Sequence, residues 1–151
     1  MDDSFFRDVY NYRRVSERIA TGGQPTEKQL AAIAAAGCKT VINLGLHDAD
    51  YALPDEGALV ESLGMEYVHI PVLWDGPTRA DLARFCDALE TRQGQDILVH
   101  CAANKRVTAF VALCRVIGQG WAADDALQYV DPQSFPKVWQ AFVDDVLGEH
   151  R

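Results

Sequence analysis

One stretch of this sequence combines residue types that could carry out nucleophilic chemistry. Residues 96–118 read DILVHCAANKRVTAFVALCRVIG: a short apolar run ends at His100 and Cys101, and Arg106 follows after four small or polar residues. The apolar segment 107–117 then has the composition of a buried helix. The start of a helix has unpaired N–H groups and the positive end of the helix dipole, which attract oxyanions and favour a thiolate. The stretch therefore predicts an anion site with Cys101 as its nucleophile.

The rest of the chain alternates strand and helix patterns. Thr26 and Gln29 form a predicted capping box, and Gly37 is a helix stop signal. Because strand–helix–strand units make right-handed crossovers, the alternation predicts a parallel sheet. We expect one α/β domain over residues 1–151, with a central, mostly parallel sheet of four to five strands flanked by helices. Strands are expected at about 17–21, 41–44, 67–70 and 96–100, helices at about 26–36, 54–63, 78–93, 106–117, 122–130 and 135–148, and a short helix or turn at 4–15.

Three loops should meet at one edge of this sheet. In open α/β sheets, sites form at the carboxyl ends of the strands. The loops that leave these ends are residues 45–50, 73–77 and 101–106. We therefore expect Asp48, Asp75, Cys101 and Arg106 to be neighbours.

Composition narrows the class of protein. The net charge of −8 argues against a nucleic-acid partner and against an anionic membrane surface. No apolar run approaches the ~20 residues of a membrane span, and the N-terminus lacks a secretory signal pattern, so a cytoplasmic protein is expected. The four cysteines form no CxxC pair, which indicates neither a zinc site nor a disulfide framework, and three of them fit core positions. We predict no metal and no cofactor.

The sequence resembles the small bacterial branch of cysteine-dependent tyrosine and dual-specificity-like phosphatases. The resemblance extends from about residue 23 to residue 118 and rests on the segments GGQPT, TVINL, GMEYVHIPV and VHC in that order. It implies a two-step reaction through a phosphocysteine. Cys101 would be the nucleophile, His100 would orient or tune it, and Asp75 would be the general acid. Arg106 and the loop N–H groups would hold the phosphoryl oxygens, as bidentate arginine and preorganised donors do well.

The resemblance also implies a substrate. A phosphorylated protein or a small phosphomonoester is expected, with phosphotyrosine-type substrates favoured. The predicted substrate-binding residues are Ala102, Ala103, Asn104, Lys105 and Thr108, and the last of these would hydrogen-bond the thiolate. Asn104 stands where such loops often have glycine, and asparagine tolerates the left-handed conformation better than most residues.

The loop departs from the phosphatase pattern in its length. The pattern has five residues between cysteine and arginine, whereas this chain has four. Either the loop keeps its length, with Val107 in the arginine position, or it is one residue shorter, as in rhodanese-type sulfurtransferases that carry a persulfide. A second departure is Gly45, where relatives often have arginine after the INL segment. The sequence therefore leaves three functions open: a phosphatase, a sulfurtransferase using a Cys101 persulfide, and a non-catalytic phosphate-binding pseudophosphatase.

Each candidate residue also has a purely structural interpretation. Cys101 could be a buried cysteine at a strand end, and His100 a core histidine bonded to a backbone acceptor. Arg106 could pair with a surface carboxylate. Asp75 lies in Trp-Asp-Gly-Pro, a good turn sequence by itself.

Overall fold

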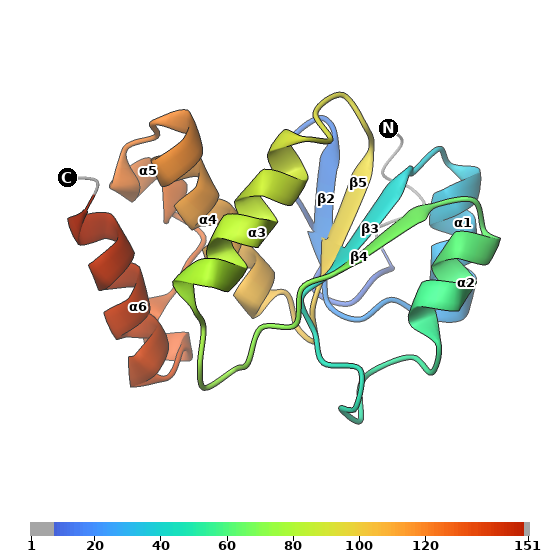
Figure 1. The fold of residues 1–151 in the computed structure, drawn as a ribbon, viewed down its shortest axis with the longest axis horizontal. Coiled ribbons are helices and arrows are strands. Elements are labelled where there is room, and N and C mark those ends of the chain that lie inside the picture. The colour runs from blue at the N-terminus through green and yellow to red at the C-terminus, as the bar shows by residue number, and fades with distance from the viewer. Residues whose placement is uncertain (1–7, 150–151) are drawn as a thin grey trace.

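A five-stranded sheet forms the centre of the structure, a computed structural model that describes residues 8–149 (Figure 1). The strand order is β1-β2-β5-β3-β4; the last four of these strands are parallel, and β1 pairs antiparallel with β2 at the edge. The predicted α/β fold with a mostly parallel sheet is therefore confirmed. The strands are β1 (Arg13–Arg14), β2 (Ile19–Gly22), β3 (Thr40–Asn43), β4 (Glu66–His69) and β5 (Ile97–His100).

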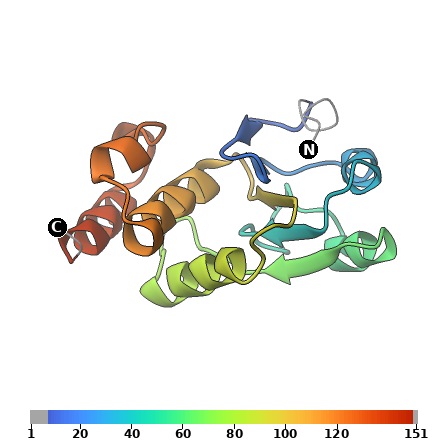
Figure 2. The ribbon, with the colours of Figure 1, turned by 90° about the horizontal axis from the view of Figure 1, so that it is seen from above.

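Helices cover both faces of the sheet (Figures 1 and 2). Side chains alternate along the central strands, so Val41 and Leu98 enter one apolar core with α1 and α2, whereas Ile42 and Val99 enter a second core with α3, α4 and α6. Between residues 8 and 149, no helix is long and apolar enough to cross a bilayer. The helices are α1 (Glu27–Ala35), α2 (Glu56–Ser62), α3 (Arg79–Glu90), α4 (Lys105–Gln119), α5 (Ala123–Ala126), the 3-10 turn η2 (Pro132–Ser134) and α6 (Lys137–Gly148).

Local signals predicted the starts of α1 and α3 correctly. The capping box is present, with the Thr26 hydroxyl accepting from the Gln29 N–H and the Gln29 side chain accepting from the Thr26 N–H. The Thr78 hydroxyl accepts from the Asp81 N–H at the start of α3. These contacts satisfy donors that a helix start leaves unpaired.

Two segments differ from the prediction. Residues 8–11 form a turn and Arg13–Arg14 form β1, while residues 4–7 of the segment predicted as a helix or turn lie outside the described residues. Helix α5 ends at Ala126 rather than continuing to residue 130. Residues 127–129 form a turn instead, and the Val130 N–H donates to the Leu127 carbonyl at 2.9 Å rather than continuing the helix.

The prediction of no disulfide is wrong. The Sγ atoms of Cys86 in α3 and Cys114 in α4 are bonded at 2.12 Å, with their Cα atoms 5.5 Å apart. Motifs such as CxxC detect only cysteines that are close in sequence. Cys86 and Cys114 are 28 residues apart and meet because their helices pack side by side on one face of the sheet. Cys38 and Cys101 are free and buried.

Candidate active site

Cys101 lies at the bottom of a cavity at the start of α4. It directly follows β5, is only 1% exposed, and its N–H donates to the Gly22 carbonyl at 3.3 Å. The cavity has a volume of about 340 Å³, and several of its lining residues lie in the loop that follows the carboxyl end of β5. It is lined by Tyr51, Trp74, Cys101, Ala102, Ala103, Lys105 and Arg106.

Arg106 faces the same cavity as Cys101. Its guanidinium is buried and donates to the Val72 carbonyl at 2.7 Å and to the Tyr51 hydroxyl at 3.1 Å. Val107, the other candidate for the arginine position, is fully buried in the apolar core. The geometry therefore corresponds to a loop that is one residue shorter, with Arg106 supplying the cation.

The shorter loop directs the Thr108 side chain into a different cavity from the one that Cys101 lines. The Thr108 hydroxyl donates to the Asn104 carbonyl at 2.5 Å, and its side chain lines a neighbouring cavity beside Arg13 and Tyr129. Successive helix residues are about 100° apart around the axis, because a helix has 3.6 residues per turn. A loop shortened by one residue therefore rotates the hydroxyl from the expected direction.

Asn104 has a structural role at the turn of this loop. Its φ of 66° is left-handed, as the substitution of asparagine for glycine predicted. Its side chain is buried and donates to the Asn11 carbonyl at 2.8 Å and to the Thr21 hydroxyl at 3.0 Å. These two bonds fix the loop to β2 and to the turn before β1.

The backbone of the GGQPT segment contacts the loop that follows Cys101. The Gln24 N–H donates to the Ala102 carbonyl at 3.1 Å, and a Cβ atom on Gly23 would lie 2.5 Å from that same carbonyl oxygen. Only glycine therefore allows the two backbones to approach this closely.

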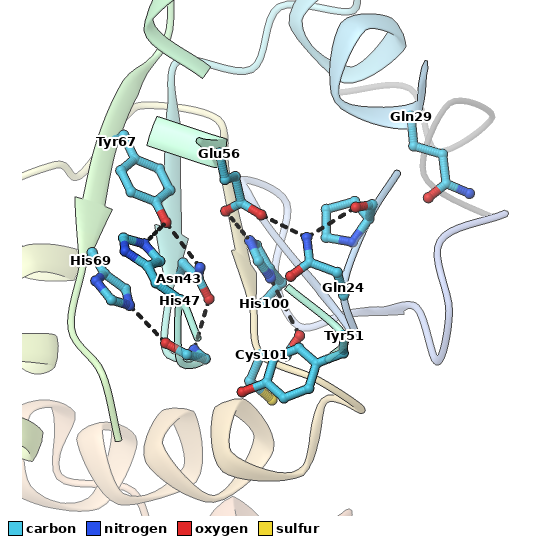
Figure 3. A network of polar contacts seen from close by, with 12 residues as sticks. Gln24, Gln29, Asn43, His47, Tyr51, Glu56, Tyr67, His69, His100 and Cys101 are labelled. Atoms are coloured by element: carbon cyan, nitrogen blue, oxygen red, sulfur yellow. Dashed lines mark hydrogen bonds and ion pairs between the residues drawn. The ribbon is translucent and has the colours of Figure 1, made fainter. Parts of the chain in front are cut away.

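Next to Cys101 lies a buried carboxylate–histidine pair (Figure 3). His100 Nε2 is 2.8 Å from Glu56 Oε2, and His100 Nδ1 is 3.4 Å from the Cys101 carbonyl oxygen. Gln24 Nε2 donates to the other Glu56 oxygen at 2.6 Å. Burial by itself would raise the pKa of Glu56, but the hydrogen bond and charge of His100, with Gln24 and Tyr67, outweigh it and lower that pKa overall. Glu56 is therefore a carboxylate at neutral pH.

Gly45 makes room for Tyr51. A Cβ at Gly45 would lie 3.0 Å from Asn43 Oδ1 and 3.0 Å from the Tyr51 ring. The Tyr51 hydroxyl accepts from the Leu46 N–H at 2.8 Å as well as from Arg106. Gly45 thus leaves space for the Tyr51 ring, which forms one wall of the cavity and accepts a hydrogen bond from Arg106.

The side chains on the far side of Glu56 form a second polar cluster (Figure 3). The rings of His47 and His69 stack with centroids 3.7 Å apart, and the Tyr67 hydroxyl contacts both His47 and Asn43 at 2.9 Å. Burial lowers the pKa of His69, so this ring is neutral at pH 7. Among residues 8–149, no three histidine, cysteine or carboxylate side chains are grouped to hold a metal ion.

Neither predicted aspartate lines the cavity. Asp48 is exposed, and Asp75 is exposed in the turn between Leu73 and Gly76. Trp74, next to Asp75, does form part of the cavity wall. The structure thus brings Cys101 and Arg106 together, and leaves the two carboxylates outside that cavity.

Sequence reasoning missed Glu56, Tyr51 and the side chain of Gln24. Glu56 lies in the first turn of a helix, where an acidic residue is ordinarily explained by the helix dipole. Its partner His100 is 44 residues away in the chain. Tyr51 lies just beyond the predicted loop, and only the glycine at position 45 signalled that space was needed there.

The comparisons with known proteins agree with this architecture. The sequence model of the family described as "DSP-PTPase phosphatase fused to NAD+ Kinase" matches residues 6–139 of this chain. A DUF442 protein of Shewanella putrefaciens, described as a candidate phosphatase, has 31% identity and a TM-score of 0.88, covering 99% of both chains. TpbA of P. aeruginosa, solved in complex with phosphotyrosine, shares the fold with a TM-score of 0.71, 22% identity and 98% and 90% coverage.

Curated relatives are longer proteins. A beta-lactamase hydrolase-like protein of Xylella fastidiosa is 32% identical over 106 residues, which are 68% of this chain and 24% of that protein. The similarity therefore covers about a quarter of the relative's length. Because the model of the DSP-PTPase phosphatase family matches residues 6–139, this chain belongs to that family.

Proposed function

We propose that this protein is a cysteine-dependent phosphatase that hydrolyses phosphomonoesters, with phosphotyrosine-type substrates favoured. One observation carries the proposal: Cys101 and the Arg106 guanidinium line the same cavity at the start of α4. A thiolate is a strong nucleophile near neutral pH, and a guanidinium matches the geometry of phosphate oxygens. TpbA, which shares the fold, was solved with phosphotyrosine bound.

In the first step, the Cys101 thiolate attacks phosphorus and the ester bond to the leaving oxygen breaks. Arg106 has two of its five N–H groups bonded to Val72 and Tyr51 within the described residues, so three remain for the phosphoryl oxygens. The N–H groups of residues 102–106 and the dipole of α4 add preorganised positive charge. The product of this step is a phosphocysteine on Cys101.

The leaving oxygen needs a proton, and we assign the general acid to Asp75. Its exposed position in the turn before α3 means that the turn has to close over bound substrate to deliver the proton. In the second step, water attacks the phosphocysteine, Asp75 accepts a proton from that water, and inorganic phosphate and the thiolate are released. Asp75→Asn should therefore lower kcat strongly while leaving substrate binding nearly unchanged.

Turnover of an aryl phosphate by purified protein tests this function. Wild type should release the aryl alcohol continuously, and Cys101→Ser should abolish the release. Cys38→Ser is the matched control, because Cys38 is the other free, buried cysteine and lies in the opposite core. Absence of turnover in wild type, or equal turnover in Cys101→Ser, contradicts the proposal.

A second candidate function is sulfur transfer through a Cys101 persulfide. The specific observation in its favour is the four-residue loop, together with a cavity whose described lining residues include no carboxylate. A persulfide is smaller than a phosphoryl group and needs no general acid on a leaving oxygen. The apolar walls from Tyr51, Trp74 and Ala102 suit polarisable sulfur.

Mass spectrometry after treatment with thiosulfate separates the two functions. Sulfur transfer predicts the mass of one added sulfur on the peptide that contains Cys101, with sulfite released. A phosphatase predicts turnover of aryl phosphates and no stable sulfur adduct. Tight binding of inorganic phosphate with neither activity would instead identify a phosphate-binding pseudophosphatase.

A further inference from the structure

We propose that Glu56 is a positioning residue that keeps both ring nitrogens of His100 protonated, so that the resulting imidazolium stabilises the Cys101 thiolate. The inference rests on the proposed role of Cys101 as the nucleophile. It holds equally for transfer of phosphorus and transfer of sulfur, because both reactions begin from a thiolate.

The neighbours of His100 determine where its protons lie. Nε2 faces a Glu56 carboxylate oxygen at 2.8 Å, and Nδ1 faces the Cys101 carbonyl oxygen at 3.4 Å. Both of these oxygens are hydrogen-bond acceptors only. A neutral ring has one bare nitrogen, whose lone pair would then face another acceptor. The doubly protonated ring satisfies both neighbours.

Burial makes the counter-ion necessary. The side chain of His100 is 0% exposed and that of Glu56 is 1% exposed, so water reaches neither of them. A buried cation is costly unless it is paired and hydrogen-bonded. Gln24 holds the second Glu56 oxygen at 2.6 Å and thereby fixes the carboxylate in place against His100. In this pair the imidazole ring of His100 lies next to Cys101, and the Glu56 carboxylate lies on the opposite side of that ring (Figure 3).

The surrounding groups leave this role to Glu56. Burial raises the pKa of Tyr67 and lowers the pKa of His69, so both are uncharged at neutral pH. The remaining titratable side chains that line the Cys101 cavity or stack on His69 include no carboxylate, so none of them can act as the counter-ion of an imidazolium. They are Tyr51 ahead of α2, Lys105 and Arg106 at the start of α4, and His47 stacked on His69.

Alkylation of Cys101 by iodoacetamide at a series of pH values tests the proposal without any turnover. In Glu56→Gln, the pH of half-maximal alkylation should rise by about one unit, because a charge within a few ångströms shifts ionisation by this order. At pH values below that midpoint, alkylation should be roughly tenfold slower than in wild type. Peptide mapping separates Cys101 from Cys38, whose slow alkylation is the internal reference because burial raises the pKa of Cys38 to about 11.

Gln24→Leu is the matched control. It removes a hydrogen bond from the same carboxylate but leaves its charge, so it should shift the midpoint much less than Glu56→Gln. An unchanged midpoint in Glu56→Gln would mean that the pair only supports the fold, and a downward shift would mean that the carboxylate acts on the thiolate directly. Either outcome overturns the proposal.

Nitrogen NMR of the unaltered protein gives an answer even if Glu56→Gln does not fold. At pH 7 both ring nitrogens of His100 should show the signature of protonated nitrogen. A neutral ring with one bare nitrogen would overturn the proposal. If alkylation and NMR agree with it while aryl phosphates are not turned over, the proposed phosphatase activity fails and the role of Glu56 stands.

Discussion

At the scale of single residues, the shortened loop depends on one asparagine. Asn104 adopts a left-handed conformation and makes two buried hydrogen bonds with its side-chain amide. An alanine at this position would lose both contributions. The left-handed backbone costs a non-glycine residue about 1–2 kcal/mol, and the lost bonds cost about 1–3 kcal/mol.

Asn104→Ala should therefore lower the free energy of unfolding by about 2–5 kcal/mol. Urea unfolding measures the change. Asn104→Gly keeps the backbone conformation and loses only the hydrogen bonds, so its stability should lie between those of wild type and Asn104→Ala. Equal stabilities for the two variants would show that the left-handed backbone is not a source of strain here.

Gly23 is the second residue on which the loop depends. Gly23→Ala would place a Cβ 2.5 Å from the Ala102 carbonyl, so the loop must move and activity of Cys101 should fall at least tenfold, as displacements of ~1 Å can cause. Gly118→Ala is the control, because its Cβ meets nothing within 4 Å and helical alanine is more stable than glycine. Aryl phosphate turnover and thiol alkylation both measure the effect. Unimpaired turnover and alkylation in Gly23→Ala would mean that the close approach is not needed.

At the scale of elements, a disulfide joins the two helices that cover one face of the sheet. Helix α4 begins at the candidate site, and Cys114 in its interior is bonded to Cys86 of α3. The bond closes a segment with a sequence separation of 28 residues. In the chain-entropy description, closing a segment of this length stabilises the fold by about 3–4 kcal/mol.

Reduction should lower the free energy of unfolding by about 3–4 kcal/mol. Urea unfolding with and without a phosphine reductant measures this, and a variant with both Cys86→Ser and Cys114→Ser should not respond to the reductant. Site geometry depends on other contacts, so thiol alkylation of Cys101 should change little. Stability that is independent of reductant in wild type would contradict the bond.

Most helices and strands were predictable from the sequence. The contacts between segments that are distant in the chain were not. Capping at Thr26 and Thr78 and apolar runs at the strands are local signals, so the helix starts and the parallel order follow from short segments. Strand β1 has two residues and no apolar pattern of its own, and it forms only because β2 offers an edge. The disulfide likewise depends on two helices whose cysteines are 28 residues apart in the chain.

The candidate site likewise has a part that the sequence predicts and a part that it does not. The Cys101 loop, Arg106 and the left-handed Asn104 follow from one continuous stretch of sequence. Glu56, which contacts His100, comes from a helix 44 residues earlier, and no periodicity links the two positions. A buried carboxylate has the same appearance in sequence as the exposed acid that normally begins a helix.

At the scale of the whole molecule, the second free thiol should limit stability at alkaline pH. Burial is the main reason that the pKa of Cys38 rises from 9.0 to about 11. The folded state therefore favours the neutral thiol, and this contribution is complete below pH 9 and is lost as the pH rises to about 11. Its size is on the order of 2–3 kcal/mol.

Wild type should thus lose about 2–3 kcal/mol more stability between pH 9 and pH 11 than Cys38→Ala does. Cys38→Ala is less stable at neutral pH, since it leaves a small void, but its stability should change less with alkali. Thermal or urea unfolding at several pH values gives the comparison. Parallel curves for the two proteins would show that Cys38 ionises equally easily in both states.

The fold as a whole places a cavity lined by cationic side chains on an acidic protein. The net charge is −8, yet the cavity over Cys101 is lined by Lys105 and Arg106 and has no carboxylate among its described lining residues. If this cavity binds phosphate as proposed, local contacts rather than long-range attraction would select the anion. In the proposed reaction, the phosphoryl group is transferred to the Sγ atom of Cys101.

Rapid acid quenching during turnover of an aryl phosphate tests this claim most directly. Peptide mass spectrometry should find one added phosphoryl group on the peptide that contains Cys101, and none on the peptide that contains Cys38. Wild-type protein that turns over the ester with no phosphoryl group on Cys101, or with one on another residue, would contradict the account.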